Sequence, residues 1–213
     1  FDRFHSNAGR IYRAINEQHD AADRPLALSA PILAEKMRGE FPEVENTARL
    51  TQNRTMLLSA GDMQSYESAG IMADPSLFEI FDFPFIKGDP ATALSDLHSI
   101  VMTESKAEKY FGSENPIGKI VRIDDSIDFT VTGVIADIPG NSHLQFDIVR
   151  PFELLTEQGR DLADWGDVSF STYVLLNANA SVEAVNEKIA ALIRREEPDR
   201  TNFYFLQSLK DIH

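Results

Sequence analysis

The apolar residues near the C-terminal end follow two periods in succession, and this succession constrains the fold more than any other feature. Residues 173–176 form a short apolar run typical of a buried strand. Ser181 then offers a helix N-cap, and apolar residues recur at helical spacing up to Ile193. Pro198 ends this helix, and residues 203–206 form a second apolar run. The sequence therefore predicts a β-α-β unit here.

The N-terminal region shows the same order of elements. Residues 11–15 alternate as a half-buried strand would, Pro31 opens a helix that Pro42 stops, and residues 47–51 return as a strand. The helix and following strand faintly resemble those near the C-terminus. This similarity is consistent with an internal duplication and equally with coincidence between two amphipathic helices.

Between these two units the chain becomes rich in short strands and turns. Short helices are predicted after Pro75 and Thr103, and alternating patterns at 119–124, 128–138 and 143–149 predict strands. The expected class is α+β, with two β-α-β units flanking a mixed, β-rich insert. We expect residues 1–55 and 144–213 to form one discontinuous subdomain and residues 56–143 the insert.

Composition excludes several classes of protein. A chain of 213 residues with 43% hydrophobic residues can bury a core, but its formal net charge of −14 would repel nucleic acids and anionic lipid headgroups. The absence of cysteine rules out disulfides, thiolate metal sites and cysteine nucleophiles. No apolar run approaches the roughly 20 residues needed to cross a bilayer, so we expect any membrane segments to lie outside this stretch.

No motif indicates catalysis. The segment from Gly112 to Lys119 differs from a phosphate-binding loop because five residues separate its glycines and Ile120 stands where Ser or Thr is required. The five histidines lack metal-binding spacing, and Asp124, Asp125 and Asp128 lack the calcium-loop pattern. We therefore expect no catalytic, metal-binding or cofactor-binding residues and no cofactor.

Two features suggest contact with a partner. Trp165 lies in a polar, glycine-containing segment, and Met56, Leu57 and Met63 surround a predicted hairpin at Gly61. Each group could contact a partner or belong to the core, and the core is the favoured interpretation for both.

Several long stretches of the sequence resemble the MacB-like periplasmic core domain of FtsX-type ABC transporter permeases, particularly those of Bacteroidetes-type bacteria. These stretches are ADPSLFEIFDFPFIKGDPATAL, VMTESKAEKYFG, ENPIGK and FTVTGVIADIPGNSHLQFD, together with the terminal FDRFHSNAGRIYRA and SLKDIH. They follow one another over nearly the whole chain. The resemblance implies a Porter-like subdomain built from both ends of the chain and an inserted Sabre-like subdomain.

The resemblance also implies a location and a role. Such a domain lies between the first two transmembrane helices of a permease, on the periplasmic face of the bacterial inner membrane, with Phe1 and His213 leading to those helices. ATP hydrolysis belongs to a separate cytoplasmic ATPase subunit or domain, and a second permease copy is expected as a partner.

The implied mechanism is mechanotransmission, in efflux or in the transport of lipoproteins or peptides. We expect the coupling contacts near the membrane, at Asp2, Arg3, Phe4, Lys210 and Asp211. The alternative is a module that binds a lipoprotein, peptide or small hydrophobic molecule directly. An envelope hydrolase has no supporting motif.

Overall fold

The computed structural model describes residues 1–19, 25–200 and 203–212. Its backbone separates into two compact units, residues 1–50 with 160–213 (unit 1) and residues 51–159 (unit 2). The expected α+β class is confirmed. The chain passes between units at 50/51 and 159/160. The boundaries expected from the sequence were 55/56 and 143/144, and they differ because residues 144–159 supply a strand and a short helix to unit 2.

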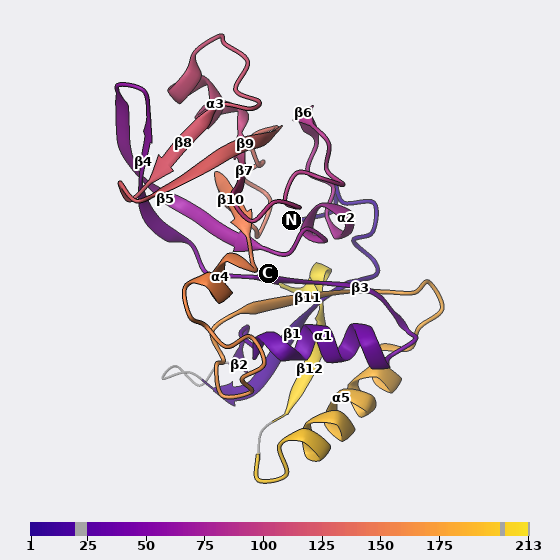
Figure 1. Ribbon diagram of the computed structural model, residues 1–213. Coiled ribbons are helices and arrows are strands. Elements are labelled where there is room, and N and C mark those ends of the chain that lie inside the picture. Colours follow the sequence, from indigo (N-terminus) through magenta and orange to yellow (C-terminus); the bar gives the residue numbers. More distant parts are fainter. Residues whose placement is uncertain (20–24, 201–202, 213) are drawn as a thin grey trace. The chain divides into compact units, whose positions relative to one another are not determined.

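Unit 1 is a four-stranded antiparallel sheet with two helices (Figure 1). Its main strands lie in the order β3-β11-β1-β12, and the short β2 adds to one end of β1. Because β11 lies between β1 and β3, the two predicted β-α-β units are interleaved as a split arrangement. The elements are β1 (Ile11–His19), β2 (Pro25–Leu26), α1 (Pro31–Glu40), β3 (Val44–Leu50), β11 (Ser171–Leu176), α5 (Val182–Glu196), β12 (Tyr204–Ser208) and the 3₁₀ helix η1 (Leu209–Asp211).

Both helices of unit 1 pack on the same face of its sheet. Leu33 and Met37 of α1 join Ile189 of α5 in a cluster of buried side chains that also includes Ala14 of β1 and Val174 of β11. The predicted start signals are present: proline occupies the first turn of α1, and the Ser181 hydroxyl accepts the backbone N–H of Ala184 at 3.2 Å. The helical spacing of apolar residues thus produces the buried stripe that the sequence predicts.

Unit 2 is a barrel closed by parallel as well as antiparallel pairs. The circuit runs β4-β5-β10-β7-β9-β8 and back to β4, with β5–β10 and β7–β9 parallel. β6 pairs with β9 outside this circuit. The elements are β4 (Arg54–Ala60), β5 (Met63–Ala73), α2 (Leu77–Ile80), β6 (Phe85–Gly88), β7 (Ser99–Thr103), α3 (Glu104–Phe111), β8 (Ile120–Ile123), β9 (Ile127–Ile135), β10 (Ile148–Pro151) and α4 (Leu154–Glu157).

The barrel interior holds an arginine among apolar side chains. Phe129 and Val131 of β9 are fully buried, and the strand register places Ile100 beside Val131 on the same side. The alternation of β10 directs Arg150 to this side too, where its guanidinium carbon lies 5.6 Å from the centre of the Phe129 ring. Burial lowers the pKa of Arg150 to about 10.

The strand expected at 143–149 covers only Ile148–Pro151. The preceding residues form turns instead, because the side-chain amide of Gln145 donates to the carbonyls of Pro139 and Ser142, each at 3.0 Å. Phe146 is buried, with its ring centre 5.1 Å from that of Phe83. The apolar alternation in this segment therefore reflects side-chain packing and not strand pairing.

Gly88 generates a testable prediction because it combines a backbone φ of +87° with a close approach to β9. A Cβ at this position would lie 2.3 Å from the carbonyl oxygen of Thr132. We expect Gly88→Ala to lower the free energy of unfolding by about 3 kcal/mol, from left-handed backbone strain plus the clash.

Gly61 is a matched control, since its φ is +55° but a Cβ there would meet open space. Gly61→Ala should cost about 1 kcal/mol. Urea denaturation followed by circular dichroism measures both, and equal losses would contradict the prediction.

Candidate functional site

The chain enters and leaves the sheet of unit 1 at one edge. β1 and β12 are antiparallel neighbours, and Tyr12, near the start of β1, pairs with Ser208 at the end of β12. Just outside this pair, a Cβ at Gly9 would lie 3.4 Å from Nζ of Lys210. The segments before β1 and after β12 are therefore close together.

Arg10 fixes the turn that precedes β1. One Nη donates to the carbonyl of Leu176 at 2.8 Å and lies 2.5 Å from a carboxylate oxygen of Glu45, while the other donates to Asn7 at 2.7 Å. These contacts tie the N-terminal turn to the end of β11 and the start of β3.

The five residues expected at the membrane-proximal edge have different environments. Arg3, Lys210 and Asp211 are exposed, and Phe4 is 40% exposed. Asp2 is only 1% exposed and adopts a φ of +54°. Thus three of the five offer accessible charges, whereas the carboxylate of Asp2 belongs to the interior.

Asp2 acts electrostatically on Tyr173 of β11. Burial raises the pKa of this tyrosine to about 12, and the nearby charge of Asp2 adds to that effect. Arg13 of β1 acts in the opposite direction, and its Nη2 also donates to Gln207 of β12 at 2.8 Å. The N-terminal segment is therefore linked to the middle of the sheet as well as to its edge.

The four residues expected to contact a partner lie in different surroundings. Trp165 is half-buried against the core of unit 1, and its carbonyl accepts from Arg200 at 2.8 Å. In β4, Met56 is buried and Leu57 is half-buried. Met63, the first residue of β5, is 43% exposed. Of the four, Met63 offers the most accessible apolar side chain.

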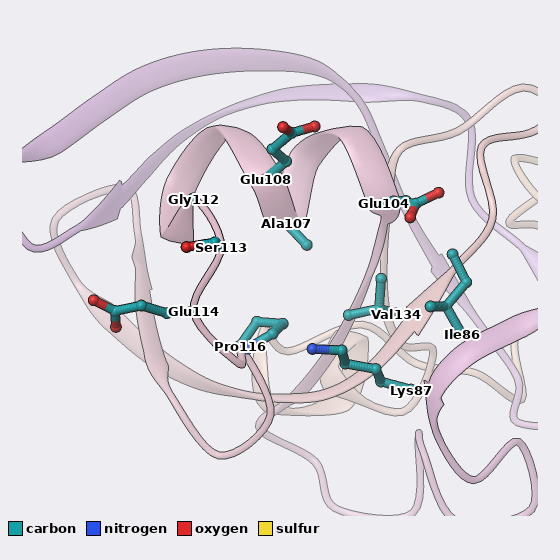
Figure 2. A pocket seen from close by; sticks show the side chains of 10 residues that line it. All are labelled: Ile86, Lys87, Glu104, Ala107, Glu108, Gly112, Ser113, Glu114, Pro116 and Val134. Atoms are coloured by element: carbon teal, nitrogen blue, oxygen red, sulfur yellow. The ribbon is translucent and has the colours of Figure 1, made fainter.

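Unit 2 contains a surface pocket of about 270 Å³, to which β6, α3, β9 and the loop after α3 contribute (Figure 2). Figure 2 shows the carboxylates of Glu104, Glu108 and Glu114 directed away from its centre, while the ammonium of Lys87 points toward Pro116. The lining residues are Ile86, Lys87, Glu104, Ala107, Glu108, Gly112, Ser113, Glu114, Pro116 and Val134.

The lining of this pocket mixes charged and apolar side chains. Ala107, Pro116 and Val134 are buried apolar residues, and the Lys87 ammonium donates to Asn115 at 3.2 Å. The volume is just below the range of about 300–1,000 Å³ that is usual for small-molecule sites. The pocket is therefore a small surface depression of mixed character.

The loop that resembles a phosphate-binding loop closes one side of this pocket. Its Gly118 N–H donates to the carbonyl of Val131 at 2.8 Å, and the Lys119 ammonium pairs with Glu114. Both groups are thus occupied within the protein. The loop attaches the pocket to β9, in agreement with the interpretation drawn from its spacing.

A buried carboxylate fixes α3, which forms one wall of the pocket. The side chain of Glu67 in β5 is 4% exposed, and its oxygens lie 2.6 Å from the ammonium groups of Lys106 and Lys109 and from the hydroxyl of Tyr110. Burial would raise the pKa of Glu67, but these three donors outweigh it and hold the pKa below its usual value. This cluster was not expected from the sequence, although the i, i+3, i+4 spacing of the donors on one helix face could have indicated a shared partner.

Within residues 1–19, 25–200 and 203–212, no three His, Cys, Asp or Glu side chains gather in a way that could hold a metal ion. Over the same residues, no helix has both the length and the apolar character needed to span a membrane.

A family model for the MacB-like periplasmic core domain matches residues 1–192. The chain therefore belongs to the MacB-like periplasmic core domain family, whose members are domains of ABC transporter permeases and not enzymes themselves. No curated protein sequence matches the chain.

Three solved structures share the fold. A domain of a putative permease from Porphyromonas gingivalis has a TM-score of 0.82 at 24% identity, covering 96% of this chain and 92% of its own. The periplasmic region of MacB from Actinobacillus actinomycetemcomitans has a TM-score of 0.71 at 15% identity, and the match covers 96% of this chain and 91% of that one. The extracellular domain of the noncanonic ABC-type transporter YknZ from Gram-positive bacteria has a TM-score of 0.66 at 16% identity, and the match covers 92% of this chain and 99% of that one.

The Glu67 cluster predicts a pH-dependent contribution to stability. Glu67→Gln removes the charge that three donors share, and we expect it to lower the free energy of unfolding by about 2–3 kcal/mol at pH 7. Because the pKa of Glu67 is lowered in the folded state, the charge stabilises the fold above the ordinary glutamate pKa, and this stabilisation is lost as pH falls through the lowered value. The difference between wild type and variant should therefore shrink in acid.

Urea denaturation between pH 3 and pH 7 measures this difference. Glu114→Gln is the control, because the carboxylate of Glu114 is exposed and pairs only with Lys119 at the surface. A pH-independent loss for Glu67→Gln would contradict the proposed electrostatic role.

Proposed function

We propose that this domain couples ATP hydrolysis in the cytoplasm to movement on the outer side of the bacterial inner membrane, in efflux or in lipoprotein or peptide transport. The observation that carries this proposal is the pairing of the start of β1 with the end of β12. If both ends continue into transmembrane helices, these helices meet the domain at adjacent positions on one rigid sheet. A change in their positions would then move the sheet as a body.

The packing of unit 1 supports transmission of such a movement. The turn before β1 is held by Arg10, and both helices share one buried cluster with the sheet. A close-packed interior does not deform continuously, so a displacement at its edge is passed on and not absorbed. In this proposal unit 1 is the Porter-like subdomain and unit 2 the Sabre-like subdomain.

The proposal implies two partners within the transporter. A cytoplasmic ATPase subunit or domain supplies the movement through the membrane helices, and a second permease copy supplies the paired periplasmic domain. The exposed charges of Arg3, Lys210 and Asp211 are the proposed contacts near the membrane. His213 is outside the described residues.

Coupling predicts that a flexible junction disconnects movement from ATP hydrolysis. In the full-length permease with its ATPase, a spin label at the exposed Glu187 of α5 reports the distance between the two copies. We expect this distance to change on addition of a non-hydrolysable ATP analogue. Gly-Ser linkers of about six residues placed before Phe1 and after His213 should abolish the change while ATP hydrolysis continues.

The double variant Arg3→Glu with Lys210→Glu should reduce the same change. Arg38→Glu, an exposed charge reversal at the last turn of α1, is the matched control. A distance change that survives both the linkers and the double reversal would contradict the coupling role.

The pocket of unit 2 supports a second candidate function, direct binding of a lipoprotein, peptide or small hydrophobic molecule. Its buried lining of Ala107, Pro116 and Val134 would receive an acyl chain or an apolar side chain. Under this candidate the domain itself recognises the transported molecule. It differs from coupling because binding would occur in the isolated chain without ATP.

Binding in the pocket predicts that a bulky residue at its rim excludes the ligand. We expect the isolated chain to bind a dansyl-labelled N-palmitoyl tripeptide and Ser113→Trp to weaken this binding at least about tenfold. The control Asn179→Trp places the same side chain on an exposed loop of unit 1. Fluorescence titration measures both affinities, and equal binding by the two variants would remove the pocket as the site.

A further inference from the structure

The barrel of unit 2 encloses one charged side chain that its interior does not satisfy. Arg150 of β10 is only 7% exposed, and its guanidinium carbon lies 5.6 Å from the centre of the Phe129 ring. The Nε atom of Arg150 is shielded from solvent and has no hydrogen-bond partner. Among the residues that the structure describes, none accepts a hydrogen bond from the Nη groups either. A guanidinium carries five N–H donors, so most of its hydrogen-bonding capacity is unused.

Such a state is uncommon for a buried cation. A charged donor without an acceptor costs more free energy than the loss of an ordinary hydrogen bond, and the contact with the Phe129 ring recovers only part of that cost. When a buried donor in a native protein has no acceptor within the chain, a bound ion or water is a usual explanation. Arg150 therefore indicates a place where an acceptor from outside the chain is bound.

The strand registers place Arg150 near one end of the barrel. β10 ends one residue later at Pro151, β9 begins two residues before Phe129, and β7 begins directly after His98. Because β10 is antiparallel to β7 and β7 is parallel to β9, these three positions lie at the same end. The exposed ring of His98 stands perpendicular to the Phe129 ring, with the ring centres 5.7 Å apart. Solvent thus reaches this end of the barrel close to the guanidinium.

A second arginine is directed toward the same side of the sheet. Arg54, the first residue of β4, pairs with Gly70 of β5, which pairs with Ile148 of β10, two residues before Arg150. Arg54 is exposed, and the part of the chain that the structure describes gives it no hydrogen-bond or ion-pair partner. Burial has the largest effect on the pKa of Arg150 and lowers it, Asp124 raises it, and Arg54 lowers it further. The two guanidinium groups are therefore near enough to repel each other.

The charges at this end favour a single negative charge. The carboxylate of Asp124 accepts the backbone N–H of Leu57 at 2.9 Å, and its charge offsets one of the two arginines. Glu157 is engaged with His98, whose Nε2 lies 3.2 Å from its carboxylate. One positive charge is thus left over. A carboxylate carries one negative charge, and its planar shape matches the paired N–H groups of a guanidinium.

We propose that this end of the barrel binds a carboxylate from outside the chain, held between the guanidinium groups of Arg150 and Arg54. The carboxylate supplies the acceptor that Arg150 lacks, and Arg54 adds a second cation at the exposed rim. The C-terminus of a peptide and an acidic side chain both offer this group, and the measurement below distinguishes them. The proposal is independent of the coupling role and of the pocket beside α3.

The test uses the complete 213-residue chain labelled with ¹⁵N, with the Nε–H signals of its arginines observed by NMR. The probes are acetyl-Ala-Ala, which has a free C-terminal carboxylate, and acetyl-Glu-methylamide, which has only a side-chain carboxylate. Acetyl-Ala-Ala-amide is the uncharged control, and sodium chloride keeps the ionic strength constant. We expect saturable shifts of the Arg150 and Arg54 signals with the carboxylate probes and none with the control. Tighter binding of one carboxylate probe identifies the source of the group.

Variants test the two arginines separately. Arg54→Gln should weaken the tighter-binding probe at least about fivefold, because it removes one charge-assisted contact. Arg54 is exposed, so this variant should keep the fold. Arg150→Met should abolish the saturable shift of Arg54, and it should not lower stability, since an apolar side chain replaces a buried charge without an acceptor. Arg38→Gln, at an exposed position of α1, is the matched control and should change affinity less than about twofold.

Three outcomes would overturn the proposal. They are shifts that grow without saturation, as screening alone produces, equal shifts with the uncharged amide, and unchanged affinity in Arg54→Gln. Each would mean that water alone serves the donors of Arg150. The distance measurement on the full-length permease and the Ser113→Trp titration do not involve either arginine, so a failure here is distinguishable from a failure of those proposals.

Discussion

The sheet of unit 1 depends on one strand that comes from the far side of a long insertion. β11 pairs with β3 through Ser171 and Leu50 and with β1 through Leu175 and Ile11. Because β11 separates β1 from β3, the sheet is incomplete until the chain has passed through all of residues 51–159. The interleaving also explains how an insertion of this length is tolerated. The strands on either side of the insertion, β3 and β11, are direct neighbours, so the chain leaves and re-enters unit 1 at adjacent positions.

The parts of the fold that were predictable from sequence are those with a regular period and a clear end. α5 shows this best: the Ser181 cap, the apolar stripe through Ile189 and the stop at Pro198 gave a helix that the structure has at Val182–Glu196. The parts that were not predictable depend on pairing between distant segments. The closure of the barrel requires β5 to run parallel to β10, about 75 residues later, and no local pattern encodes that choice. The same limit applies to residues 143–147, where alternation arose from turns and ring packing.

The candidate sites illustrate a similar division. The sequence shows that residues 112–119 depart from a phosphate-binding loop, and in the structure the Gly118 N–H donates to the carbonyl of Val131. The position of Glu67 could not be predicted from the sequence, because a glutamate in an alternating strand resembles a solvent-facing residue until α3 supplies its three partners. Asp2 was expected to make a coupling contact near the membrane because of its place near the chain end. Its side chain is instead buried, and its charge acts on Tyr173. The presence of an acidic residue in the sequence therefore does not indicate whether its carboxylate is buried or exposed.

The antiparallel pairing of β1 and β12 has a mechanical consequence. If tension were applied to pull the two chain ends apart, it would act at one end of a ladder of hydrogen bonds, which would open one pair after another from Tyr12 and Ser208 inward. The strand pair resists force in this direction only weakly, because its hydrogen bonds break one after another and do not share the load. Tension or compression applied to both ends together acts on the whole sheet instead. The β1–β12 ladder is thus weak toward separation of its two ends, whereas a joint displacement of both ends loads all the strands of unit 1.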